Sequence, residues 1–411
     1  MKKRILFVDD EPRVLDGLRR MLHSMAGEWD MVFVGSGEQA LQLMGREPFD
    51  VLVTDMRMPR MSGAQLLSEV MKRWPGTIRF VLSGHSDQQM TLQTVTSAHQ
   101  YLNKPCDPQQ LVGAIDRACA LRERLAPHRT AGNLAASLRT LPSLPEVYFK
   151  LASELQSPDT SLQRIGNIIS GDIGMTAKIL QMVNSAFFGL PQRITNPAQA
   201  VTLLGLETVK GLIVSVHVFS EFKNEKASGL SALALWSHSI GVSKFAKRIA
   251  ESEKSDQRTI SDSFTAGLLH DAGKLVLATA LPKEYAQALE SARKEGKSAS
   301  EAETGVFGTT HAGIGAYLLT LWAFPDPVVE AVTFHHNPAE SLAEGFQPLA
   351  AVHVANALEH RLSTGGTGRN DGINLAYIQR LGLEGRLSVW EEALQSMTQK
   401  GTEHECESAL R

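Results

Sequence analysis

The stretch "VLVTDM" at residues 51–56 decides the fold of the first part of the chain. It is apolar almost throughout and ends on an aspartate. Runs of the same kind alternate with helical patterns over residues 1–122: "RILFVD" (4–9), "MVFVGS" (31–36), "RFVLSG" (79–84) and "QYLNKP" (100–105). Strands that are apolar throughout suit a parallel sheet covered by helices on both faces. The alternation predicts a doubly wound, flavodoxin-like α/β domain.

The pattern changes in the second part of the chain. From about residue 138 onward, segments such as "SLQRIGNIIS" (161–170) and "WSHSIGVSKFAKRIAESE" (236–253) have the spacing of amphipathic helices. We therefore expect a multidomain protein, with an α/β domain over 1–122, a linker over 123–137 and an all-α domain over 138–345. Residues 346–411 are expected to form a C-terminal helical extension that packs on the all-α domain.

Composition limits the possible classes of function. The 411 residues are 43% hydrophobic and 21% charged, as in ordinary globular proteins, and a net charge of −3 gives no basic surface for DNA. Cys106, Cys119 and Cys406 are odd in number and far apart, which favours the reducing cytoplasm over a disulfide framework. The longest apolar runs, such as residues 212–219, are too short for membrane insertion.

Polar residues stand at the ends of the predicted strands. Asp9 and Asp10 end the first strand, Asp55 the third, Ser83 the fourth and Lys104 the fifth. The carboxyl ends of parallel strands line one crevice, where grouped carboxylates suit Mg²⁺. Asp55 could then attack a phosphoryl donor, while Lys104 and Ser83 bind the phosphate oxygens. Solvation of loop acids is the plainer alternative, but five such residues in this order favour the phosphoacceptor site.

These residues lie in motifs that resemble the receiver domain of two-component response regulators: "VDDEP" (8–12), "VTDMRMPRMSG" (53–63), "VLSG" (81–84) and "YLNKP" (101–105). The resemblance implies that Asp55 accepts phosphate from a sensor histidine kinase. It also implies that Asp10, Asp55 and the backbone carbonyl of Arg57 hold Mg²⁺, with Asp9 assisting.

The same resemblance implies a conformational switch. Tyr101 would be the aromatic residue that turns inward when Ser83 closes on the phosphate. The peptide bond between Lys104 and Pro105 would be cis, an arrangement that proline tolerates.

The helical part contains a second set of candidate residues. His238, His270, His311 and His335 are separated by tens of residues, so only the fold could gather them. The full set of possible metal ligands is His238, His270, Asp271, His311, His335 and His336. Imidazoles with a bridging carboxylate suit Fe, Mn, Zn or Ni, and a metal-bound water could hydrolyse a phosphoester held by Lys274. The alternative is a group of core histidines that are satisfied by hydrogen bonds, the interpretation we prefer for His217 and His353.

Residues 138 to about 345 resemble the HDOD domain, a relative of the HD-superfamily phosphohydrolases. The motifs "LPSLPEV" (141–147) and "HDAGKLVLA" (270–278) carry the resemblance. It implies a signalling or protein-interaction module. By analogy with HD hydrolases, His238, His270 and Asp271 begin a metal set whose closing aspartate is replaced by Asn356, a weaker ligand.

The remaining histidines resemble ligands of another branch of the superfamily. His311, His335 and His336 are similar to the additional ligands of the HD-GYP cyclic-di-GMP phosphodiesterases, although the GYP motif does not follow "HHNP" (335–338).

Two hypotheses of function follow. In the leading hypothesis, phosphorylation of Asp55 controls an HDOD output that binds an unidentified protein partner, or a second copy of the chain. In the alternative, phosphorylation gates a metal-dependent phosphohydrolase that acts on a cyclic dinucleotide or nucleotide.

Overall fold

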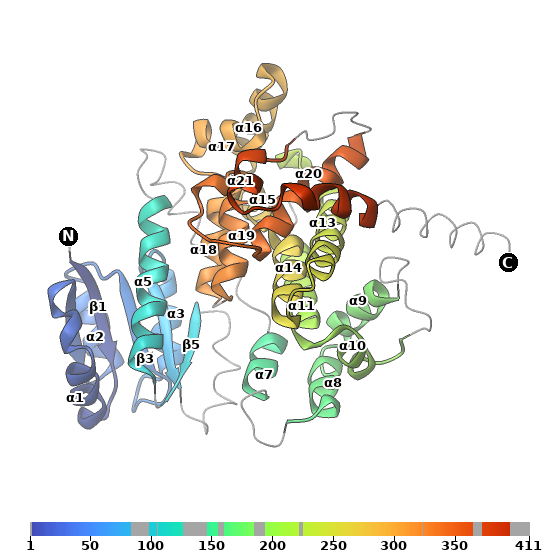
Figure 1. Ribbon diagram of the computed structural model, residues 1–411. Helices are drawn as coiled ribbons and strands as arrows, with labels where there is room; N and C mark the ends of the chain where they lie inside the picture. The colour runs from blue at the N-terminus through green and yellow to red at the C-terminus, as the bar shows by residue number, and fades with distance from the viewer. Residues whose placement is uncertain are drawn as a thin grey trace. The chain divides into compact units, whose positions relative to one another are not determined.

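The computed structural model describes residues 2–83, 98–104, 106–125, 146–154, 160–184, 194–221, 225–322, 324–364 and 372–394. The chain divides into two compact units. The first, here called the α/β unit, consists mainly of residues 1–149, and the second, the helical unit, consists of most of residues 150–411. Figure 1 shows the elements of both, coloured along the chain.

The α/β unit is built on a parallel sheet. Its strands within the described residues are β1 (Lys3–Val8), β2 (Trp29–Val34), β3 (Val51–Asp55), β4 (Ile78–Ser83) and β5 (Gln100–Asn103). Their order is β2-β1-β3-β4-β5, and each neighbouring pair is parallel. This order is that of a flavodoxin-like, doubly wound sheet, so the predicted fold class is confirmed.

Helices cover both faces of this sheet. They are α1 (Pro12–Met21), the short η1 (His23–Gly27), α2 (Gly37–Met44), α3 (Gly63–Arg73) and α5 (Pro108–Leu125). Alternate strand residues such as Leu6, Leu52 and Val81 pack with α2 and α3 in one buried cluster. Since successive strand residues point to opposite faces, the residues between them form a second layer. Asp116 of α5 joins this unit through an ion pair to Lys3.

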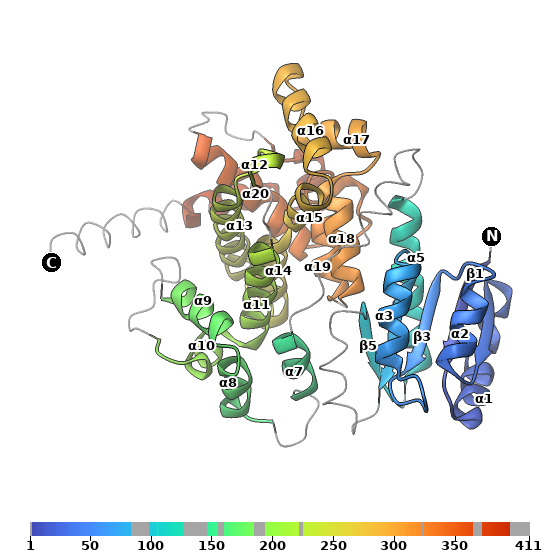
Figure 2. The same cartoon turned by 180° about the vertical axis from the view of Figure 1, so that it is seen from behind.

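The helical unit consists of many short helices. Those that precede the histidine-rich region are α7 (Glu146–Glu154), α8 (Leu162–Ser170), α9 (Ile173–Val183), α10 (Pro197–Leu204), α11 (Leu206–Glu221) and α12 (Glu225–Ser228). Helices α8, α9, α10 and α11 pack on one another, and Figure 2 shows this group from behind. Ser161 and Asn196 begin α8 and α10 by accepting hydrogen bonds from backbone N–H groups of the first turn, as N-caps do.

The remaining helices carry the candidate metal ligands. They are α13 (Ala232–Ser252), α14 (Gln257–Leu269), α15 (Ala272–Ala280), α16 (Pro282–Glu295), α17 (Ala299–Phe307), α18 (His311–Leu321), α19 (Asp326–Phe334), η4 (Pro338–Glu340), α20 (Pro348–Thr364), α21 (Leu375–Arg380) and η5 (Glu384–Arg386). Helix α13 packs against α14 and α20, and α19 packs against α14 and α20 (Figure 1). Helix α20 therefore shares a core with the histidine-rich helices.

Among the described residues, no helix combines the length and the apolar character needed to cross a bilayer.

Helix α14 contains a buried acid that makes the stability of the helical unit depend on pH. Asp262 is 7% exposed, and its nearest cation is Arg258, whose Nε lies 3.9 Å from the Asp262 carboxylate. Burial, with the negative charge of Glu207 adding to it, raises the pKa of Asp262 to about 6. A folded-state pKa above the unfolded value of about 3.9 means that ionisation favours the unfolded chain. This destabilisation develops as the pH rises from about 4 to about 6 and stays constant above that range.

We therefore expect Asp262→Asn to stabilise the helical unit at about pH 8 and to change little at about pH 4. The expected gain is about 1–2 kcal/mol, after allowing for screening of a carboxylate beside an exposed arginine. Urea unfolding at the two pH values measures it. An equal effect at both would show that Asp262 does not titrate in this way.

Candidate functional site

The first candidate site lies at the carboxyl edge of the parallel sheet. Asp9 directly follows β1, Asp55 ends β3 and Lys104 follows β5. The Lys104 Nζ atom lies 2.7 Å from Asp9 Oδ2 and also contacts Asp55 Oδ1. The structure therefore brings together three of the residues that the strand ends predict.

The two carboxylates are buried and held in place. Asp9 is 2% exposed and Asp55 is 6% exposed. Asp55 Oδ2 accepts a hydrogen bond of 2.6 Å from the backbone N–H of Arg57, and Asp9 Oδ1 accepts one of 2.9 Å from Glu11. These contacts leave the Asp55 Oδ1 atom, which faces Lys104, as the oxygen directed into the site.

Burial sets the electrostatics of this site. Burial raises the pKa of Asp55, and the charge of Asp9 adds to this effect, while Lys104 opposes it. Burial by itself would lower the pKa of Lys104, but its hydrogen bonds to Asp55 and Asp9 outweigh burial and raise it. Two carboxylates facing one lysine leave a net negative charge, which suits a hard divalent cation with oxygen ligands.

The structure describes only some of the other residues that the receiver motifs predict. Asp10 is partly exposed, and within the described residues its side chain makes no hydrogen bond or ion pair. The side chains of Ser83 and Tyr101 and the whole of Pro105 lie outside the described part of the structure. Their roles, and the Mg²⁺ ligands Asp10 and Arg57, therefore stay predictions.

The second candidate site is a histidine cluster in the helical unit. His238 lies within α13, and His311 is the first residue of α18. His270 directly follows α14, and Asp271 directly precedes α15. His335 and His336 directly follow α19. The helices bring all six predicted ligands together around the Asp271 carboxylate, in two groups of possible ligand atoms: His238, His270 and Asp271; and Asp271, His311, His335 and His336.

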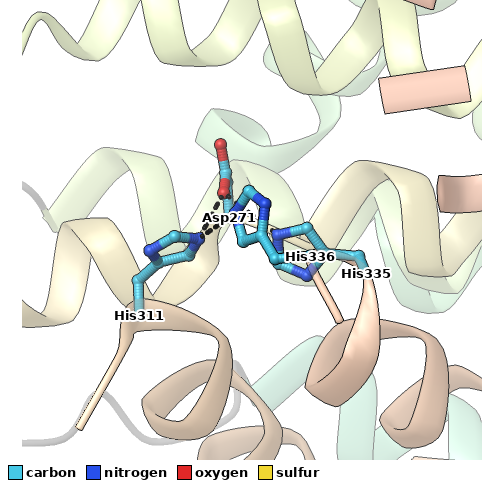
Figure 3. Close-up of side chains that lie close together, drawn as sticks. All are labelled: Asp271, His311, His335 and His336. Atoms are coloured by element: carbon cyan, nitrogen blue, oxygen red, sulfur yellow. Dashed lines mark hydrogen bonds and ion pairs between the residues drawn. The ribbon is translucent and has the colours of Figure 1, made fainter. Parts of the chain in front are cut away.

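The first oxygen of Asp271 faces the larger group. Asp271 Oδ1 lies 3.2 Å from His311 Nε2 and 3.8 Å from His335 Nε2. The Nε2 atoms of His311 and His336 are 3.1 Å apart. Figure 3 shows the Asp271 carboxylate between His311 and the neighbouring rings of His335 and His336. One oxygen and three imidazole nitrogens therefore converge on one small region.

The second oxygen of Asp271 faces the smaller group. Asp271 Oδ2 lies 3.4 Å from His270 Nε2 and 3.8 Å from His238 Nε2, and these two nitrogens are 3.2 Å apart. The Lys274 Nζ atom, one turn further along α15, lies 2.7 Å from the same oxygen. Asp271 is thus placed to bridge two cations, with Lys274 at the edge of the site.

The outer nitrogen of each of four histidines points away from Asp271 to a fixed acceptor. His270 Nδ1 lies 2.7 Å from the carbonyl oxygen of Gly267, and His335 Nδ1 lies 2.8 Å from that of Val332. His311 Nδ1 lies 2.6 Å from Glu303 Oε2. The fourth pair is His238 Nδ1 with the Glu359 carboxylate. An Nδ1–H that donates outward leaves the Nε2 lone pair directed inward, the arrangement of metal-bound histidines.

The charges of the cluster also suit metal ligands. Burial lowers the pKa of His270 and lowers that of His335 well below its usual range, so these rings stay neutral. Burial by itself would raise the pKa of Asp271, but its contacts with His270 and with the charged Lys274 hold that pKa well below its usual value. Neutral His270 and His335 beside an ionised Asp271 are in the protonation states that metal binding requires. For His311, burial by itself would lower the pKa, but the charge of Glu303 outweighs burial and raises it.

Two atoms of the cluster have no hydrogen-bond partner. Within the described residues, Asp271 Oδ1 and His335 Nε2 are buried and accept no hydrogen bond. Buried polar atoms without partners are costly, and they call for a water or an ion. The residues present therefore fit a transition metal with nitrogen and oxygen ligands.

Further residues surround the histidine cluster, and not all of them were predicted from the sequence. Asn356 lies on α20, and its role as a weak metal ligand stays a prediction. Glu303 and Glu359 contact the cluster but were not identified in the sequence, because no motif marks either residue and only the packing of α17 and α20 brings them near it. His353 is a core histidine, as predicted, since its Nδ1 bonds to the His335 carbonyl and its Nε2 accepts from the Asn374 N–H.

A glycine lets α15 approach α18 at this site. A Cβ atom on Gly273 would lie 1.9 Å from the His311 carbonyl oxygen and 2.8 Å from the Gly315 nitrogen. Both are backbone atoms, so the two helices would have to separate. We expect Gly273→Ala to lower the free energy of unfolding by about 2–4 kcal/mol, whereas Gly385→Ala, which meets no atom within 4 Å, should change it by less than about 0.5 kcal/mol. Urea unfolding measures both, and equal effects would contradict the prediction.

Comparison with protein families agrees with both sites. The response regulator receiver domain model matches residues 5–116, and the HDOD domain model matches residues 141–338. The first match contains the acidic site of the α/β unit. The second contains every residue of the histidine cluster except those on α20.

Individual relatives match only part of the chain. An uncharacterised protein of Treponema pallidum is 30% identical over 232 residues, which cover 56% of this chain and 44% of that protein. The hydrogenase transcriptional regulatory protein HoxA of Cupriavidus necator is 38% identical over 116 residues, which cover 28% of this chain and 23% of that protein. The chain thus spans less than half the length of these curated relatives.

A solved structure resembles the larger part of the chain. It is an HDOD domain protein of unknown function from Geobacter sulfurreducens, 22% identical, with a TM-score of 0.51 over 69% of this chain and 98% of that one. At this identity the likeness concerns the fold. The chain therefore carries a response regulator receiver domain followed by an HDOD domain, the architecture of a response regulator with an HD-like output.

Proposed function

We propose that a sensor histidine kinase phosphorylates Asp55 and that this phosphorylation controls the output of the HDOD domain. The observation that supports the proposal is the contact of Lys104 with both Asp55 and Asp9 at the carboxyl edge of the sheet. A cytoplasmic location belongs to the same proposal. Cys106 and Cys119 form no disulfide among the described residues, which agrees with it, because reducing compartments keep cysteines in the thiol form.

The chemistry follows from the residues of the site. Asp55 Oδ1 attacks the phosphorus of a phosphohistidine, an O–P bond forms, and the P–N bond breaks as the kinase histidine leaves. Lys104 neutralises charge on the transferred phosphoryl group. Mg²⁺ held by Asp55 with Asp10 or Asp9, and with the Arg57 carbonyl, would supply further positive charge toward the phosphoryl oxygens.

Hydrogen exchange of the full chain tests control of the HDOD domain. We expect addition of a small-molecule phosphodonor to change exchange within residues 150–394 of the wild type and to leave Asp55→Ala unchanged. Light scattering on the same samples reports whether phosphorylation changes the oligomeric state. Identical exchange and identical mass with and without the donor would reject the proposed control.

A second function is favoured by the histidine cluster. We propose that the HDOD domain binds two transition-metal ions and hydrolyses a phosphodiester such as a cyclic dinucleotide. The supporting observation is the pair of buried atoms without a hydrogen-bond partner, Asp271 Oδ1 and His335 Nε2, among converging imidazoles. Metal ions at this cluster would supply a nucleophilic hydroxide and polarise the phosphoryl group. Lys274, which is partly exposed, would bind a phosphate oxygen.

Activity assays distinguish this second function from a module without catalysis. Protein loaded with Mn²⁺ or Fe²⁺ should release a linear or mononucleotide product from cyclic-di-GMP, and Lys274→Met should slow the release. Bound metal without turnover of cyclic-di-GMP or of a generic phosphodiester would leave a metal-binding module and reject the hydrolase.

A further inference from the structure

Helix α20 brings an acidic side chain to the histidine cluster at a position that the HD pattern does not predict. Glu359 lies one turn after Asn356, and its Oε2 atom contacts His238 Nδ1. His238 Nε2 points the other way, toward His270 and Asp271. The contact therefore lies behind His238, on the side opposite to the candidate metal position.

The packing of α13 and α20 makes room for this contact. Gly241 lies one turn after His238 on α13, and a Cβ atom there would lie only 2.8 Å from Glu359 Cγ. The glycine thus leaves the space that the stem of Glu359 occupies. The Glu359 side chain is 16% exposed, so solvent screens its contact with His238 only in part.

The larger ligand group has an equivalent carboxylate. Glu303 is 1% exposed and accepts from both the Nδ1–H and the backbone N–H of His311, at 2.6 and 2.7 Å. Each half of the cluster therefore has one histidine with a carboxylate behind it. Such a carboxylate fixes the tautomer and orientation of the ring and makes Nε2 more basic.

We propose that Glu359 is a positioning residue that orients His238 and supplies the negative charge that Asn356 does not provide. Asp271, the carboxylate in the smaller ligand group, also serves the larger one. A divalent cation between His238, His270 and Asp271 would otherwise be balanced by only part of one negative charge. Glu359 adds a full charge one imidazole away. This inference rests on the second proposed function, metal binding by the cluster.

Metal binding by the full chain gives the first test. We expect Glu359→Ala to weaken the binding of one of the two Mn²⁺ ions by about 10–100-fold in calorimetric titration. The affinity for the other ion should be unchanged. Glu359→Gln, which keeps an acceptor for Nδ1–H but loses the charge, should be intermediate. Glu251→Gln, on the surface of α13, is the matched control and should bind as the wild type. Equal binding by wild type and Glu359→Ala would overturn the proposal.

A measurement on the metal-free protein tests the role of Glu359 independently of metal binding. Nitrogen-15 NMR of the histidine-labelled, metal-free chain should show His238 as the Nδ1–H tautomer in the wild type. Glu359→Ala and Gly241→Ala should each shift His238 toward the Nε2–H form. If the wild type binds no Mn²⁺, the second proposed function fails, and the tautomer still decides the role of Glu359. An unchanged tautomer in both variants would overturn it.

Discussion

Asp55→Ala should abolish phosphorylation of the chain, with a loss of at least about 100-fold in the rate of labelling by acetyl phosphate. The reason is that Asp55 Oδ1 is the carboxylate oxygen directed at Lys104, while its Oδ2 is engaged by the Arg57 N–H. Gel electrophoresis that retards phosphorylated protein measures the labelled fraction.

Two variants complete this experiment. Asp16→Asn replaces an exposed acid of α1 that pairs with Arg19, and it should be labelled as fast as the wild type. Lys104→Ala should retain the nucleophile but lose the cation that neutralises the phosphoryl group, so we expect slower labelling rather than none. Labelling of Asp55→Ala at the wild-type rate would mean that another residue accepts the phosphate.

Asp271→Asn should remove both metal ions from the HDOD domain. Asp271 is the residue shared by the two ligand groups, since one oxygen faces His270 and His238 and the other faces His311 and His335. Asparagine keeps the shape but loses the negative charge and one of the two acceptor oxygens. We expect at least about 100-fold weaker binding at both positions, measured by metal analysis after dialysis and by calorimetric titration.

The control for this variant is His360→Gln, an exposed histidine of α20 outside both ligand groups, which should bind two ions as the wild type does. Asp271→Asn also leaves Lys274 without its ion-pair partner, so the unfolding of each variant should be measured beside its metal content. Full metal content in a folded Asp271→Asn protein would show that Asp271 does not bridge the ions.

Short sequence patterns were sufficient to predict the strands of the α/β unit. Its strands are buried on both faces, so their sequences are apolar throughout and can be recognised one by one. The predicted run "VLVTDM" became β3, which ends on Asp55, and the other four runs became the strands beside it. Because parallel strands end at one edge, the sequence also predicted that Asp9, Asp55 and Lys104 would meet.

The sequence alone therefore determined the fold classes of both parts, the acidic site and the identity of the six residues in the histidine cluster. Only the tertiary structure decided which oxygen of Asp271 faces which histidine, and that Glu303 and Glu359 lie behind two of the rings. The physical reason is the difference in sequence separation between the residues that interact. Strand and helix periodicity is written in neighbouring residues, whereas the contact of His238 with Glu359 joins helices 121 residues apart through the packing of α13 on α20.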